Sequence, residues 1–317
     1  MKTLTMTKPA ILPTLSSVAA TLEPTPPFDL CHSLRFIAAF PPTHGEQAVL
    51  PDALWKALRL DGRTILAEVR DAATPSQPRL SVNLHYKAAE GPLPPALRDR
   101  ALLRLRRLLS LDDDLTPFYA EAERDPCFAP VARRLRGLHQ VRFPTPFEIA
   151  AWAVLTQRTR IPAARSMKNA ITELICGNAG AIDHAGVHHT AFPEASEVAA
   201  AGANTLATVL GAGPRASRIG ALARAFCDVD DQFLYKAHYQ QVETWLRGLP
   251  GIGPWSAAFI LLRGLGRTEL IPVGEARLDE AVKRVYGTSM DAKEMSRVAS
   301  RYGALQGYWA YYLRVNA

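Results

Sequence analysis

A stretch rich in glycine and proline, residues 249–259, constrains the fold of this chain more than any other segment. The amphipathic run Tyr239–Arg247 precedes it and predicts a helix. Gly251 and Gly253 then supply backbone positions that tolerate positive φ, and Pro254 suits the first turn of a following helix, where a missing N–H breaks no hydrogen bond. The stretch therefore predicts two helices joined by a tight hairpin.

The predicted hairpin has the properties of a phosphate-binding turn. Backbone N–H groups of Gly251 and Gly253 would point outward at the positive end of a helix dipole, with no side chain in the way. The same Gly-x-Gly-Pro pattern is also a common connection between two helices, and it recurs at residues 211–214. Taken alone, the pattern leaves both interpretations open.

Positive charge is concentrated in the half of the chain that holds the hairpin. Of the 317 residues, positions 1–130 hold 15 Lys and Arg against 15 Asp and Glu, whereas positions 131–317 hold 22 against 15. The net charge of +7 therefore lies in the second half. A basic surface there suits a polyanion such as nucleic acid, although a modest excess also serves solubility.

The first 112 residues predict a flexible leader followed by a small α+β domain. Residues 1–25 are rich in Thr, Pro, Ala and Ser and lack the compact apolar centre of a signal peptide, so we expect a flexible leader. Residues 64–70 and 79–86 largely alternate apolar with polar side chains on either side of turn-forming residues, which predicts an antiparallel pair. Residues 93–109 place apolar side chains at helical spacing. The α+β domain is therefore expected over residues 26–112.

Residues 113–317 predict a mostly helical region. Residues 147–155 are apolar nearly all round, which indicates a buried central helix, and residues 165–176 predict another helix. Residues 177–193 are interpreted as a loop. No run of about 18 apolar residues occurs, so we expect no membrane-spanning helix and no membrane partner. The predicted fold class is α+β, with a small antiparallel sheet domain followed by helices.

The four cysteines are scattered and show none of the short spacings that hold zinc or an iron–sulfur cluster. They are Cys31, Cys127, Cys176 and Cys227. We expect reduced thiols in a cytosolic protein.

A second motif lies beyond the hairpin, and the two motifs together resemble those of a known family. Trp255 and Phe259 follow the hairpin, Arg263-Gly264 comes next, and a segment with Pro272 delivers Glu275, 24 residues past Gly251. This ordered set resembles the helix-hairpin-helix DNA glycosylases, most closely the 3-methyladenine DNA glycosylase II type, over roughly residues 26–315. The resemblance implies a two-part helical glycosylase core over residues 113–317.

The resemblance also implies an activity. Enzymes of this family flip a damaged nucleotide out of double-stranded DNA into an aromatic cleft, where an acid stabilises the oxocarbenium-like sugar as the glycosidic bond breaks. Carried over by position, Glu275 is the catalytic acid, and Trp255, Phe259 and Phe36 line the base pocket. We therefore expect a cytoplasmic, nucleoid-associated monomer that acts in base-excision repair of alkylated bases.

Further site residues follow from the same resemblance. The residues expected to contact DNA are Gly251, Gly253, Gln157 and Arg158. The family's hairpin holds a monovalent cation through backbone carbonyls, which correspond here to those of Arg247, Leu249 and Ile252. The chemistry itself is expected to need no cofactor.

The chain departs from the family pattern at several positions. The usual acid is Asp, and Glu275 is longer by one methylene, about 1.5 Å. Arg158 stands where an apolar or amide side chain usually fills the gap left by the flipped base, and Arg314 stands where a further pocket aromatic is common. Residues 305–308 match the family's Trp-Arg-Ser-Tyr segment only in part.

Two absences narrow the expected reaction. Trp255 stands where relatives that also cut the DNA strand carry a nucleophilic lysine, and a Schiff base needs an amine. We therefore expect a monofunctional enzyme that uses water. No cysteine follows Cys227, which argues against the family's iron–sulfur cluster.

Two other interpretations remain open at this point. One is a damage-sensing or structural DNA-binding protein that kept the hairpin and lost catalysis, with Glu275 and Arg158 as traces of that loss. The other is an unrelated helical protein with a fortuitous hairpin.

Overall fold

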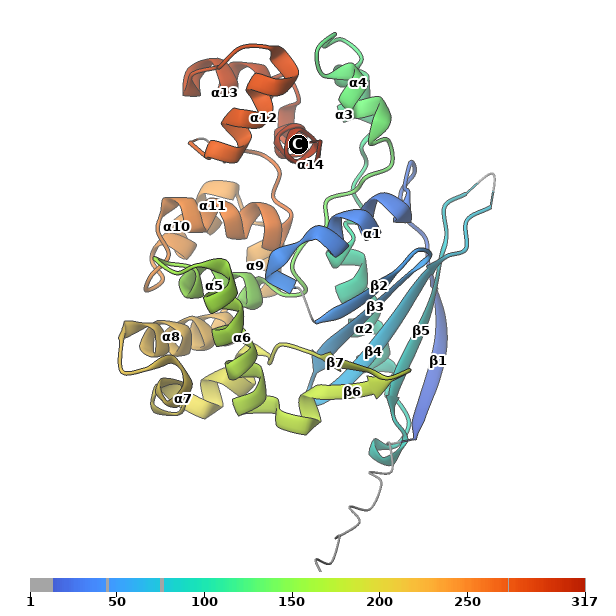
Figure 1. Cartoon of the computed structure of the whole chain (residues 1–317), viewed down its shortest axis with the longest axis vertical. Helices are drawn as coiled ribbons and strands as arrows, with labels where there is room; N and C mark the ends of the chain where they lie inside the picture. Colours follow the sequence, from blue (N-terminus) through green and yellow to red (C-terminus); the bar gives the residue numbers. More distant parts are fainter. Residues whose placement is uncertain (1–13, 44–45, 75–76, 273, 317) are drawn as a thin grey trace, which may run out of the picture.

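The computed structural model describes residues 14–43, 46–74, 77–272 and 274–316. It consists of a sheet lobe and two helical lobes, each built around its own cluster of buried apolar side chains (Figure 1). The α+β class predicted from the sequence is confirmed. Among the described residues, no helix combines the length and apolarity needed to cross a bilayer.

The sheet lobe holds an antiparallel sheet of order β1-β5-β4-β3-β2 within the described ranges. Its core includes side chains of two helices, one between the first and second strands in sequence and one after the last strand. The elements are β1 (Leu15–Leu22), α1 (Leu30–Ala39), β2 (Gln47–Leu50), β3 (Ala53–Leu60), β4 (Arg63–Asp71), β5 (Leu80–Lys87) and α2 (Pro95–Leu108).

The predicted antiparallel pair is confirmed as β4 and β5, in which Val69 lies opposite Val82. The helix predicted over residues 93–109 is confirmed as α2. The prediction of a flexible leader over residues 1–25 is wrong for residues 15–22, because these residues form β1, which pairs along its whole length with β5. Alternate β1 side chains, Val18, Ala20 and Leu22, pack on the core of the sheet lobe, and this short period was hidden by the Ser- and Thr-rich composition. Residues 1–13 of the leader lie outside the described residues.

The hairpin lobe contains the central helix and the glycine-rich turn. Its elements are α5 (Pro146–Leu155), α6 (Ile161–Cys176), β6 (Ala181–His184), β7 (Val187–Thr190), α7 (Ala195–Leu210), α8 (Pro214–Asp228), α9 (Asp231–Lys236), α10 (Tyr239–Arg247) and α11 (Pro254–Ile260), which continues into a π-helical turn, η4 (Leu261–Leu265). Thr145 caps α5, and its side chain accepts a hydrogen bond from the Glu148 N–H. Residues 147–155 are all buried, as the apolar pattern predicted.

The segment interpreted as a loop, residues 177–193, is corrected by the structure, because it contains the two-stranded ribbon β6–β7. The turn places Ala185 at φ 49° and Gly186 at φ 78°. Two-residue turns of this kind usually carry Asn or Asp before the glycine, and Ala185 gives no such signal in the sequence. The ribbon lies over one face of the sheet, where Ile182 and Ala191 pack against Ala57 and Leu66.

The C-terminal lobe is assembled from two distant segments of the chain (Figure 1). Its elements are α3 (Thr116–Ala122), α4 (Ala129–Arg134), α12 (Ala276–Tyr286), α13 (Ala292–Ser300) and α14 (Gln306–Val315). Tyrosine hydroxyls of α14 connect the segments. The Tyr308 hydroxyl donates to Asp113 Oδ2 at 2.6 Å, and the Tyr312 hydroxyl donates to the Leu138 carbonyl at 2.8 Å.

A buried group of four charges joins the sheet lobe to the hairpin lobe. Lys168 Nζ on α6 lies 2.6 Å from Glu148 Oε1 and 2.5 Å from Glu46 Oε1. Lys56 Nζ on β3 lies 3.3 Å from the other Glu46 oxygen. Burial alone would lower the pKa of Lys168, but the two carboxylates outweigh this effect and raise its pKa above the ordinary lysine value. Lys168 therefore remains charged inside the protein.

Candidate active site

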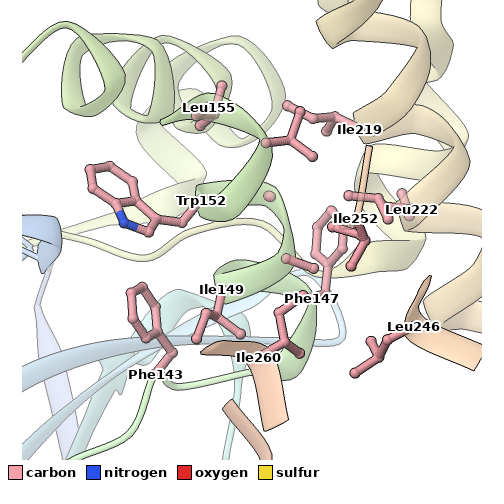
Figure 2. Close-up of a cluster of buried hydrophobic side chains, with 14 of the residues drawn as sticks. Phe143, Phe147, Ile149, Trp152, Leu155, Ile219, Leu222, Leu246, Ile252 and Ile260 are labelled. Carbon is pink, nitrogen blue, oxygen red and sulfur yellow. The ribbon is translucent and has the colours of Figure 1, made fainter. Parts of the chain in front are cut away.

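The glycine-rich turn lies between α10 and α11 and is anchored by an apolar side chain. Ile252 is buried beside Ile219 and Leu222 of α8 (Figure 2). Gly251 has φ 87°, and a Cβ there would lie 2.9 Å from Cδ of Arg218, so both conformation and space require glycine. Gly253 differs from the prediction, because its φ of −87° and ψ of 179° are extended backbone that any residue adopts. Only the first glycine is therefore needed for positive φ.

A cleft of about 990 Å³ opens between the three lobes. Glu275, Trp255, Phe259 and Phe36 all line it, although they come from α1, α11 and the start of α12. Trp255 is half exposed and stacks on Phe259, with ring centroids 5.2 Å apart and planes at 16°. The structure thus brings together the four residues carried over for catalysis and for the base pocket.

Glu275 occupies the N-cap position of α12, but its carboxylate does not cap the helix. Its backbone carbonyl accepts hydrogen bonds from the N–H groups of Leu278 and Asp279, whereas the side chain makes no capping bond. The carboxylate is mostly buried, and Arg314 Nη1 lies 3.1 Å from its Oε2. That contact is within ion-pair distance but lacks hydrogen-bond alignment, since Oε2 has no hydrogen-bond partner among the described residues. A role limited to helix capping is therefore not supported.

Arg263 is a buried cation at the wall of the cleft, and sequence reasoning gave it no role. Its guanidinium lies 4.8 Å, 4.9 Å and 5.5 Å from the ring centroids of Phe36, Phe40 and Tyr311. Its Nε donates to the Val141 carbonyl at 3.1 Å, and within the described ranges its Nη2 has no hydrogen-bond partner. Burial lowers the pKa of Arg263 to about 10, so the guanidinium remains charged at neutral pH.

The following residue explains why the motif is Arg-Gly. A Cβ on Gly264 would lie 2.6 Å from Cγ2 of Ile149 on the central helix. The π-helical turn η4 therefore packs directly on α5, which holds Arg263 at the cleft wall. Sequence reasoning also missed Phe40, Trp152 and Tyr311 as cleft aromatics, and two of them had a usable signal. Phe40 lies four residues after Phe36, and Tyr311 lies three residues before Arg314 on α14.

The two residues after the central helix have different environments. Gln157 is engaged inside the protein, because its Nε2 donates to the Gly251 carbonyl at 2.6 Å and its Oε1 accepts from Arg218 at 3.2 Å. It braces the glycine-rich turn. Arg158 is exposed, and its φ of 51° is left-handed backbone. It lines a second cavity, of about 600 Å³, together with Arg215 and Arg218.

The mouth of the cleft is rich in positive charge. Four exposed arginines line it against the exposed carboxylate of Glu280. They are Arg35, Arg134, Arg277 and Arg284. Such a rim suits the phosphates on either side of a nucleotide that enters the cleft.

Side chains of the described residues offer no cluster of metal ligands. No group of three or more His, Cys, Asp or Glu side chains in the described part of the chain could hold a metal ion. The four cysteines are free thiols. The Leu249 carbonyl accepts the Ile252 N–H at 3.1 Å, which leaves one lone pair on that oxygen for a cation. A neutral carbonyl oxygen with a free lone pair is a type of ligand that suits a monovalent cation.

Two known proteins resemble this chain in sequence. The DNA-3-methyladenine glycosylase of Bacillus subtilis (strain 168) is 27% identical over 220 residues, which cover 68% of this chain and 72% of that protein. The AlkA protein of Mycobacterium tuberculosis is 27% identical over 215 residues, which cover 67% of this chain and 42% of that protein. The chain thus spans under half the length of the second relative. No protein-family model matches the sequence.

Solved structures show the same fold over most of the chain. A 3-methyladenine DNA glycosylase from Archaeoglobus fulgidus superposes with a TM-score of 0.71 at 19% identity, covering 93% of this chain and 97% of that chain. The 8-oxoguanine glycosylase/lyase of Clostridium acetobutylicum, bound to double-stranded DNA, superposes with a TM-score of 0.57 at 17% identity, covering 86% and 96%. The chain therefore shares the fold of these DNA glycosylases, with a hairpin beside an aromatic cleft that holds Glu275, and in sequence it is similar to DNA-3-methyladenine glycosylases.

Proposed function

We propose that the protein is a monofunctional DNA glycosylase that extrudes an alkylated base from double-stranded DNA and hydrolyses its N-glycosidic bond. The observation that carries the proposal is the Glu275 carboxylate. It lies at the wall of a cleft whose aromatic residues can hold a base and whose rim is basic. The names of the two relatives in sequence support alkylated bases as the substrate class.

The carboxylate of Glu275 supplies the electrostatic part of the mechanism. As the bond between C1′ and the base breaks, positive charge develops on the sugar, and a fixed negative charge in a partly dry cleft stabilises it. Trp255 and Phe259 offer a stacked, half-exposed surface against which an extruded base can lie. Water then forms the new bond to C1′ and loses a proton to solvent.

The absence of lyase chemistry rests on Trp255. A strand-cutting relative needs an amine to form a Schiff base, and indole cannot provide one. No lysine is among the described residues that line the cleft. We therefore infer that water, and not a side chain, attacks C1′.

A monovalent cation at the glycine-rich turn is part of the proposal. The carbonyls of Arg247, Leu249 and Ile252 would hold it, and its charge would add to the attraction between the turn and a DNA phosphate. The carbonyl chemistry supports this site, and binding of duplex at constant ionic strength with potassium or with a bulky organic cation tests it.

Base release from methylated duplex DNA tests the activity as a whole. Free bases are separated and identified after incubation with enzyme, and the DNA strand is checked for breaks before any alkaline treatment. The proposal predicts free alkylated base and an intact strand. Binding of the damaged duplex without release of any base would favour the damage-sensing alternative.

Gly253→Val is expected to weaken binding of duplex DNA of any sequence by about tenfold or more, because the new side chain shields a phosphate-facing N–H group. Val is compatible with the extended backbone at this position, and no atom lies within 4 Å of a Cβ there. Fluorescence anisotropy with undamaged duplex measures the effect. Gly213→Val in the other Gly-x-Gly-Pro turn is the control for backbone and space, since Gly213 also has extended backbone and no atom within 4 Å of a Cβ. Equal affinities of the two variants would remove the turn from the interface.

Arg158→Ala is expected to slow base release from a paired lesion by about tenfold or more, with a smaller effect on the same lesion in a mismatch. The side chain lies exposed after the central helix, where it can fill the space of the extruded nucleotide, and a mismatched base costs less to extrude. Single-turnover rates on the two duplexes measure the difference. Arg160→Ala removes the same side chain two residues later, also from an exposed position, and serves as the control. Parallel losses on both duplexes would argue against a wedge.

A further inference from the structure

The charged side chains inside the cleft affect which damaged bases the cleft can accept. We propose that the cleft favours neutral damaged bases with a carbonyl acceptor over cationic alkylated bases, and that Arg314 and Arg263 determine this preference. The inference rests on the proposed glycosylase function and revises its substrate class, from alkylated bases in general to neutral damaged bases, alkylated or not.

The first observation is the balance of charge around the inner cleft. Glu275 is paired with Arg314, so the one acid carried over as catalytic does not face the cleft as an isolated negative charge. Arg263 adds a second positive charge at the wall, and no carboxylate of the described chain lies within ion-pair distance of it. The inner wall therefore carries two positive charges and one negative charge. A cationic base entering this space meets repulsion that a neutral base does not.

The second observation concerns the aromatic rings. Electron-rich rings attract a cationic base through their faces. Here the rings of Phe36, Phe40 and Tyr311 already lie around the guanidinium of Arg263. A cationic base stacked on these rings would share them with a buried cation. The stacked pair Trp255 and Phe259 remains, together with Trp152 of the cleft wall, and these rings offer a stacking surface to a neutral base as well.

The third consideration is the charge of the leaving group. When the glycosidic bond breaks, its electron pair stays with the base. A cationic base leaves as a neutral molecule, whereas a neutral base leaves with negative charge until it takes a proton from solvent. The guanidinium of Arg314, about a quarter exposed, can donate hydrogen bonds to a carbonyl oxygen on which that negative charge develops. Both arginines thus assist departure of a neutral base specifically.

The test compares two 6-oxopurines that differ in charge. Duplexes of one sequence carry either hypoxanthine, which is neutral, or 7-methylguanine, which is cationic, and base release is measured under single-turnover conditions. Arg314→Gln keeps hydrogen-bonding capacity and removes the charge. The ratio of the hypoxanthine rate to the 7-methylguanine rate is expected to fall by about tenfold or more relative to the unmodified protein.

The ratio separates selectivity from a general defect, because a misfolded or poorly positioned site lowers both rates together. Arg284→Gln is the matched control, since this arginine lines the exposed mouth of the same cleft, and its ratio is expected to change by less than about threefold. Arg263→Met extends the test to the buried cation. If the Arg263→Met protein does not fold, the ratio measured for Arg314→Gln alone tests the inference.

Two results would overturn the inference. An unchanged ratio in Arg314→Gln, or a parallel loss of both rates, would leave Arg314 as a residue that only positions Glu275. If the unmodified protein releases neither of these bases and releases no base from methylated DNA, the proposed function is wrong and the inference falls with it.

Discussion

Glu275→Gln is expected to slow single-turnover release of the base by about 100-fold or more while binding of damaged duplex is retained. The amide keeps the shape of the side chain but removes the negative charge that faces the developing charge at C1′. The substitution also removes the ion pair with Arg314, but it breaks no capping bond, since the side chain makes none to α12. Rapid quenching with enzyme in excess measures the rate, and anisotropy measures binding.

Glu280→Gln is the matched control for this prediction. Glu280 lines the same cleft but is exposed and lies on α12 beyond its first turn, so its rate of release is expected to change by less than about threefold. Glu275→Asp is expected to be intermediate, because the shorter side chain lies farther from Arg314. Release at the unmodified rate by Glu275→Gln would remove the catalytic assignment and favour a non-enzymatic DNA-binding protein.

Lys168→Met is expected to lower the free energy of unfolding by about 3–5 kcal/mol. Lys168 is buried between Glu148 and Glu46, and its loss leaves the Glu148 carboxylate buried without its cation. Glu46 keeps Lys56 as a partner. Equilibrium denaturation by urea, followed by circular dichroism, measures the change.

Two further variants make this result specific to the buried charge. Lys293→Met removes an exposed lysine of α13 and is expected to change stability by less than about 0.5 kcal/mol. Adding Glu148→Leu to Lys168→Met removes the orphaned carboxylate and is expected to recover at least about 1 kcal/mol. A Lys168→Met protein as stable as the Lys293 control would show that water or a local rearrangement solvates Glu148.

The parts of the fold that sequence could predict are those fixed by local chemistry. Gly251 has the positive φ that glycine favours, and Pro254 begins a helix, where proline is favoured. The helix-hairpin-helix unit could therefore be predicted from a few neighbouring residues. The central helix could be predicted because its mostly apolar, buried residues follow one another without interruption. Placement of Glu275 in a cleft with Trp255 and Phe259 was expected from family spacing, and all three residues line one cleft in the structure.

The rest depends on contacts between distant segments. Arg263 meets Phe36 and Tyr311 only after three lobes have packed together, and no periodicity within any one segment indicates that contact. The ion pair between Glu275 and Arg314 is of the same kind. Each residue departs from the family pattern, and only the structure shows that the two departures face each other. Selectivity, unlike fold, is therefore encoded mainly in tertiary neighbours.

The divided C-terminal lobe has a consequence for synthesis of the protein. Helices α3 and α4 leave the ribosome well before α12–α14, yet they share one apolar core with them. During translation the early helices lack the partners that cover their apolar faces, whereas the sheet lobe already has its complete core. The cleft acquires Tyr311 and Arg314 only with the last turns of α14. A nascent or prematurely terminated chain therefore has no assembled catalytic cleft, and base excision begins only when the full chain has closed on itself.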